Sequence, residues 1–139
     1  MSNKQPTFAP HPVTVHPDWH LDRCINAYQE HGSLIIGVDF DHTIRCPITG
    51  MFYITVVDLL KKAHKQGHTI CIWTANEDQT TVQAHLESVG IQYHHFNASP
   101  ILERPGIRKS HFNLLLEDTA GLSKAISTLT QFLVITKDN

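Results

Sequence analysis

Apolar residues along the chain follow two alternating patterns, one with the spacing of a helix and one a short continuous run. The helical spacing predicts four helices: from Asp18 to about His31, from Val56 to Gly67, from Val82 to Gly90, and onward from about Leu122. The continuous runs predict buried strands: Leu34–Val38, Thr69–Trp73, Ile91–Phe96, Phe112–Leu116 and, as a fifth, Phe132–Ile135. Alternating strands and helices are joined by right-handed crossovers, which make the strands parallel. We therefore predict an α/β, three-layer Rossmann-like fold, with helices on both faces of a parallel sheet.

The first 17 residues interrupt this alternation. They contain four prolines and no apolar period, so they predict an extended arm. A chain of 139 residues, of which 41% are apolar, is expected to form one core. We predict a single domain overall, in which residues 1–32 form an arm and a helix packed on a main unit of residues 33–139.

Charge and cysteine content exclude several classes of protein. The formal net charge is −2, with 11 Lys and Arg against 13 Asp and Glu, so the basic surplus usual in nucleic-acid binding is missing and such a partner is not favoured. No apolar run approaches the roughly 20 residues that span a bilayer, so we expect no membrane partner. The 3 cysteines show no Cys-x-x-Cys spacing, and polar residues and prolines follow Met1, which favours a reducing, cytoplasmic setting.

Polar residues gather where the predicted strands end, and parallel strands share one carboxyl edge of the sheet. The first strand is followed by Asp39 and Asp41, the second by Thr74 and Asn76, and the fourth by Glu117 and Asp118, with Lys109 shortly before the fourth. Asp39 and Asp41 project to the same side if the backbone between them stays extended. Four neighbouring carboxylates repel one another, so either a cation offsets the repulsion or one acid is protonated; the third and fourth acids favour a hard divalent cation, and oxygen-only ligands favour Mg²⁺ over zinc. Lys109 and the Thr74 hydroxyl suit the oxygens of a transferring phosphoryl group.

These segments resemble the motifs of a known family. The segments IIGVDFDHTI (35–44) and CIWTAN (71–76), and Lys109 followed by LLLEDT (114–119), resemble the four motifs of the haloacid dehalogenase (HAD) superfamily of phosphatases. The most specific of them is the Asp-x-Asp-x-Thr of positions 39, 41 and 43, which follows an apolar strand. The resemblance covers about residues 34–120 and implies that residues 33–139 form a HAD-like catalytic domain.

The resemblance implies a role for each matching residue. Asp39 would attack phosphorus to form an aspartyl-phosphate, and Asp41 would protonate the leaving oxygen and later deprotonate the hydrolytic water. Mg²⁺ would be held by Asp39, the backbone carbonyl of Asp41 and Asp118, with Glu117 supporting the ion or its water. Thr74 and Lys109 would hold phosphoryl oxygens. We expect four more residues to contact the substrate: Thr43, Asn76, Arg108 and His42.

Two residues depart from the family's pattern, and two other kinds of site compete with it. His42 stands where Gly is most frequent, and Glu117 where Asp is frequent. Histidine tolerates unusual backbone angles better than β-branched residues do, so we expect the turn to form, with His42 either touching the substrate or facing solvent. A response-regulator receiver also combines acids, Thr and Lys around Mg²⁺, but its acid pair belongs on the first strand, whereas here the pair comes last. A zinc site is disfavoured because no set of Cys and His has a four-ligand spacing.

The site is expected to be open, because the chain has little room for a cap domain. Only about a dozen residues separate Thr43 from the next helix, and the loop 97–108 is of similar length. We predict a phosphatase of a small phosphorylated substrate such as a nucleotide or sugar phosphate, with loops 44–53 and 97–108 selecting the leaving group. A neighbouring subunit of a homo-oligomer, or the N-terminal arm, would then close the site. The alternatives are a macromolecular phosphate, on a nucleic-acid 3′ or 5′ end or a phosphoprotein, and a catalytically silent phosphate-binding module.

Overall fold

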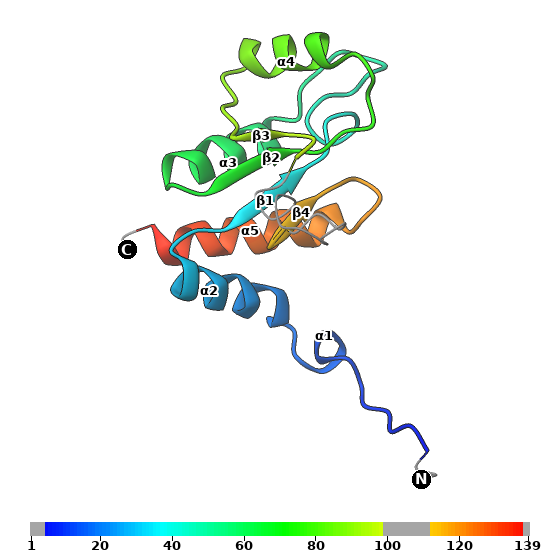
Figure 1. Ribbon diagram of the computed structural model, residues 1–139, viewed down its shortest axis with the longest axis vertical. Coiled ribbons are helices and arrows are strands. Elements are labelled where there is room, and N and C mark those ends of the chain that lie inside the picture. Colours follow the sequence, from blue (N-terminus) through cyan, green and yellow to red (C-terminus); the bar gives the residue numbers. More distant parts are fainter. Residues whose placement is uncertain (1–4, 99–111, 138–139) are drawn as a thin grey trace.

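The fold is built on a parallel sheet, shown in the computed structural model of Figure 1, which describes residues 5–98 and 112–137. The sheet has four strands in the order β3-β2-β1-β4. Their bounds are Ile35–Val38 for β1, Thr69–Ile72 for β2, His95–Phe96 for β3 and Leu114–Leu116 for β4. In the centre of the sheet, Ile36 of β1 pairs with Ile70 of β2 and with Leu114 of β4. All strand pairs are parallel, so the carboxyl ends of the strands lie at one edge.

Helices join the strands and cover the sheet. In the described part of the chain they are α1 (Pro12–Val15), α2 (Trp19–His31), α3 (Ile54–Lys65), α4 (Gln79–Ser88) and α5 (Leu122–Thr136). Helix α3 contacts β2, α5 contacts β4, and α5 also packs against both α2 and α3 (Figure 1). This arrangement confirms the predicted α/β class and is consistent with a three-layer Rossmann-like fold. Within the described residues, no helix has the length and apolar character needed to cross a membrane.

The strands form the centre of the hydrophobic core. Ile36, Val38, Ile70 and Ile72 are all fully buried, as expected for a parallel sheet with covered faces. Gly37, between two of these residues, has a special role, because a Cβ atom at this position would lie 2.7 Å from the ring of Phe112. Glycine therefore lets an aromatic ring pack directly against the backbone of β1.

The predicted fifth strand is wrong, because Phe132–Ile135 lies within α5. A four-residue apolar run cannot by itself distinguish a strand from a helix. The burial pattern around it is helical: Leu129, Phe132, Leu133 and Thr136 are buried at spacings of three and four, whereas Val134 and Ile135 are exposed.

Bounds of other elements also differ from prediction; the fourth strand, for example, is Leu114–Leu116 rather than Phe112–Leu116. The third strand comprises only His95–Phe96 rather than Ile91–Phe96, because only these residues pair with β2. Ile91 is buried, but its N–H donates to a carbonyl of α4 (3.0 Å), so it completes the end of that helix. Within the predicted extended arm, Pro12–Val15 forms the single turn α1, and the residues before it extend away from the sheet in Figure 1. Proline is compatible with the first position of a helix, where no N–H partner is needed.

Side chains close the amino-terminal edge of the sheet. Nδ1 of His68 accepts the N–H of the residue before β1 (3.0 Å), and Nδ1 of His94 accepts the N–H of Ile70 in β2 (3.0 Å). Oδ1 of Asn113 accepts the N–H of Ile35 (2.7 Å). His68 immediately precedes β2, His94 precedes β3 and Asn113 precedes β4, and each side chain accepts from the neighbouring strand or from the residue before it. Backbone donors at the start of the strands are thereby satisfied where the ladder of the sheet has not yet begun.

Candidate functional site

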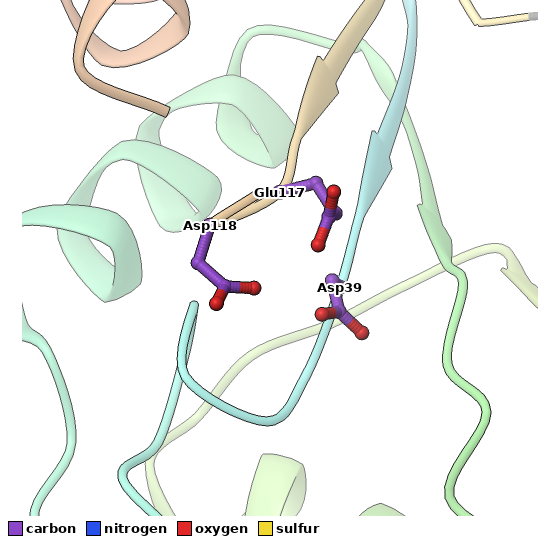
Figure 2. Close-up of side chains that lie close together, drawn as sticks. All are labelled: Asp39, Glu117 and Asp118. Carbon is purple, nitrogen blue, oxygen red and sulfur yellow. The ribbon is translucent and has the colours of Figure 1, made fainter. Parts of the chain in front are cut away.

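Three carboxylates converge at the carboxyl edge of the sheet. Asp39 directly follows β1, and Glu117 and Asp118 directly follow β4. The pairing of the two strands continues one residue further, because the N–H of Asp39 donates to the carbonyl of Leu116 (2.9 Å). One carboxylate oxygen from each of the three acids lies within 4.8 Å of the others, and Figure 2 shows the three side chains facing one another. The register of β1 against β4 therefore builds the predicted acidic cluster.

The pKa values of Asp39 and Glu117 are shifted in opposite directions. Burial raises the pKa of Asp39 from its usual 3.8 to about 6, and the charges of Glu117, Asp118 and Asp41 add to the rise, although the N–H of Phe40 donates to its Oδ1 (2.9 Å) and opposes it. The pKa of Glu117 is lowered, first by the hydroxyl of Thr119, which donates to Oε2 (2.6 Å). Ionised acids at these distances repel one another, and their donor set consists of carboxylate oxygens only. This donor chemistry fits a hard divalent cation such as Mg²⁺.

The carboxylate of Asp41 lies outside this cluster, contrary to the expectation of four converging acids. Among the described residues, the cluster comprises Asp39, Glu117 and Asp118. The reason is a tight turn after β1, in which the carbonyl of Phe40 accepts the N–H groups of residues 43 to 45 (2.9–3.3 Å). The turn ends the extended backbone that would have placed the side chains of Asp39 and Asp41 on the same side. Oδ2 of Asp41 instead accepts a hydrogen bond from Nδ2 of Asn76 (3.1 Å).

The two other residues of the first motif have different surroundings. Thr43 is fully buried, and its Oγ1 accepts the N–H of Asp118 (3.0 Å), so it holds the end of β4 rather than facing a substrate. His42 is exposed and has φ 64°, which is the left-handed conformation that the turn needs, and its N–H donates to the carbonyl of Arg45 (2.8 Å). The expectation that histidine allows this turn is confirmed.

The second motif lies at the end of β2, beside β1. Thr74 is buried, and its hydroxyl oxygen accepts the N–H of Asn76 (3.1 Å). The N–H of Thr74 donates to Oδ1 of Asn97, which follows β3 (2.7 Å). Sequence reasoning did not assign Asn97 a role at the site; its backbone has φ 51°, a left-handed conformation that asparagine tolerates, and its contact with Thr74 depends on the pairing of β2 with β3. Lys109 and Arg108, and the loop 97–108 beyond residue 98, lie outside the described residues.

Comparisons with known proteins support the fold but do not indicate an activity. No protein-family model matches the chain, and no curated protein matches it. A solved structure of a conserved protein from Bacteroides thetaiotaomicron is similar, with a TM-score of 0.56 and 21% sequence identity, over 77% of this chain and 93% of that chain. At this identity the likeness shows a shared α/β fold alone.

Proposed function

We propose that this protein is a Mg²⁺-dependent phosphomonoester hydrolase that works through an aspartyl-phosphate on Asp39. The observation that carries the proposal is the convergence of Asp39 with Glu117 and Asp118 at the carboxyl edge of the sheet (Figure 2). An aspartate that attacks an anionic phosphate must overcome the repulsion between the two groups. Mg²⁺ bound by these three acids would supply the positive charge that offsets this repulsion.

Asp39 would act as the nucleophile. Its carboxylate oxygen forms a bond to phosphorus while the bond from phosphorus to the leaving oxygen breaks, so one displacement is divided into two easier ones. Attack requires the ionised carboxylate. A pKa of about 6 leaves Asp39 largely ionised at neutral pH, and a nearby cation would lower this pKa further.

Asp41 would act as the general acid and base. It lies two residues beyond the nucleophile and outside the cation cluster, so its carboxyl group can carry a proton that a metal ligand could not. It gives this proton to the leaving oxygen in the first step and removes one from the attacking water in the second. The water forms a bond to phosphorus, the bond between phosphorus and Asp39 breaks, and inorganic phosphate leaves.

The remaining parts of the proposal concern the substrate. The Thr74 hydroxyl at the end of β2, with Lys109 and Arg108, would bind phosphoryl oxygens. We favour a small phosphorylated metabolite such as a nucleotide or sugar phosphate, hydrolysed in the cytoplasm, with loops 44–53 and 97–108 contacting the leaving group. A second subunit would cover the site if the protein is a homo-oligomer.

The test is phosphate release from a panel of phosphomonoesters, measured with Mg²⁺ and with a chelator. The panel includes nucleotides, sugar phosphates, phosphorylated oligonucleotide ends and a phosphopeptide. We expect Mg²⁺-dependent release that Asp39→Asn abolishes and that the matched control Asp58→Asn, an exposed acid on α3, retains. Tight Mg²⁺-dependent binding of an ester without its hydrolysis would instead identify a phosphate-binding module, and full activity in Asp39→Asn would refute the mechanism.

A further inference from the structure

We propose that Asn76 is a positioning residue that orients the carboxyl group of Asp41, rather than a residue that contacts the substrate. The proposal rests on the proposed function, because it concerns the group that would transfer the proton. The direct observation is the hydrogen bond from Nδ2 of Asn76 to Oδ2 of Asp41 (3.1 Å).

A second hydrogen bond decides which end of the Asn76 amide faces Asp41. The backbone N–H of Asp78 lies 2.9 Å from Oδ1 of Asn76. A backbone N–H can only donate, so the amide atom that it meets must be the oxygen. The NH₂ group therefore faces Asp41. The amide is held in the orientation in which it donates to the carboxyl group.

The backbone of Asn76 is fixed at both ends. On one side its N–H donates to Oγ1 of Thr74 (3.1 Å), two residues beyond the end of β2. On the other side Asp78 caps α4, because its Oδ1 accepts the N–H of Thr81 (3.1 Å). Asn76 thus lies between the end of a strand and the start of a helix, and a carboxyl group bonded to it inherits this rigidity.

The chemistry of an amide suits this position. The bond engages Oδ2 of Asp41 and leaves Oδ1 for the proton that moves to the leaving oxygen. An amide NH₂ donates without accepting the catalytic proton, so it orients the carboxyl group without competing for its proton. A carboxylate at position 76 would repel Asp41. An aliphatic side chain at position 76 would leave the side-chain torsion angles of Asp41 unrestrained. Both changes would reduce the fraction of molecules in which the proton points at the leaving oxygen.

Leaving-group dependence distinguishes a positioning role from a substrate contact. A general acid matters most for a leaving group of high pKa, such as an alkoxide, and least for p-nitrophenolate. We expect Asn76→Ala to lower kcat/KM by about tenfold on alkyl phosphates and by less than about twofold on p-nitrophenyl phosphate. The nearly isosteric Asn76→Asp, which keeps the acceptor for Asp78, should be more impaired than Asn76→Ala. The control Asn26→Ala, an exposed amide on α2, should match the wild-type protein.

Two kinetic results would overturn the proposal. Equal losses on all substrates would show that Asn76 binds the phosphoryl group, and unchanged kcat/KM on alkyl phosphates would show that Asp41 needs no such partner.

A readout without turnover separates this proposal from the proposed function. In ¹H–¹⁵N spectra the side-chain amide of Asn76 is assigned by its loss in Asn76→Ala. We expect Asp41→Ala to shift this signal and Asp58→Ala to leave it in place. If the wild-type protein releases no phosphate and the signal still shifts, the proposed function fails while the contact between Asn76 and Asp41 stands. A signal that does not respond to Asp41→Ala overturns the positioning role, whatever the activity.

Discussion

Replacing Asp39 with Asn is expected to abolish phosphate release and, at the same time, to stabilise the metal-free fold. The substitution removes a nucleophile, and it also removes one negative charge from a cluster of three. Asparagine keeps an oxygen that can accept the N–H of Phe40, so the local hydrogen bond survives. Loss of function would therefore coincide with a gain in stability, which is the opposite of what general damage to the fold produces.

The size of the gain follows from the pKa of Asp39. A rise from 3.8 to about 6 corresponds to at most about 3 kcal/mol of stability lost when the carboxylate ionises. Asp39 is only partly buried, and solvent screening reduces this figure to about 1 kcal/mol. For a chain of 139 residues, the melting temperature of Asp39→Asn should then rise by about 4 °C.

The effect should depend on pH in one direction. Because the pKa is raised in the folded state, the unfolded chain ionises first, and wild-type stability is lost as the pH rises from about 4 to about 6. The difference between the two proteins should be small at about pH 4 and complete above about pH 6. Thermal unfolding in the presence of a chelator, at about pH 4 and above about pH 6, measures this difference, with Asp58→Asn as the control. Added Mg²⁺ should stabilise the wild-type protein more than the variant.

Two results would refute this reasoning. If Asp39→Asn melts below the wild-type protein at neutral pH without divalent ions, burial and the neighbouring carboxylates do not destabilise the ionised form of Asp39 as its raised pKa requires. If the difference in melting temperature is the same at both pH values, ionisation of Asp39 is not its cause.

Three further predictions concern other parts of the molecule. Hydrogen bonds from the Thr49 hydroxyl and nearby backbone N–H groups lower the pKa of Cys46 to about 7, whereas burial raises the pKa of the other two cysteines to about 11, so iodoacetamide at neutral pH should modify Cys46 alone. Peptide mass spectrometry would show this, and modification of a buried cysteine in the native protein would contradict it. Burial lowers the pKa of His68, so the unfolded chain takes up the proton first and the stability of the fold is lost as the pH falls below 6.5. In urea unfolding, the stability of His68→Gln should therefore depend less on pH than that of the wild-type protein. Gly37→Ala should cost about 1–3 kcal/mol in urea unfolding, and Phe112→Leu should recover part of this loss, whereas additive effects would mean that the two residues do not clash.

The sequence was sufficient to predict the central strands and the edge at which the polar residues gather. The runs that become β1 and β4 contain only apolar residues and glycine, and β2 has three apolar residues after Thr69, as is typical of strands in a covered parallel sheet. Polar residues follow each run at the carboxyl edge. The predicted closeness of Asp39, Glu117 and Asp118 follows from the rule that parallel strands share a carboxyl edge. Their carboxylate oxygens lie within 4.8 Å of one another because β1 and β4 are neighbours in the sheet.

The features that could not be predicted depend on hydrogen bonds between segments far apart in the sequence. The hydroxyl of Thr43 meets the N–H of Asp118, and the side chain of Asn97 meets the N–H of Thr74. No local pattern encodes such a partner, since it depends on the register of two strands. The position of the Asp41 carboxylate was missed for a related reason: the turn after Phe40 redirects the chain within two residues.

The pairing of β1 with β4 has a consequence for how the site comes into existence. Ile35 and Asn113, which are hydrogen-bonded to each other, stand 78 positions apart in the sequence. A growing chain that has reached only residue 98 contains Asp39 and Thr74 but neither of the two later acids. The cluster therefore forms only when a long loop has closed, which is a slow, non-local step in folding. An ion that binds all three acids would bind the closed sheet and not its open precursors, so the supply of that ion would increase the share of molecules in which the first and last strands are joined.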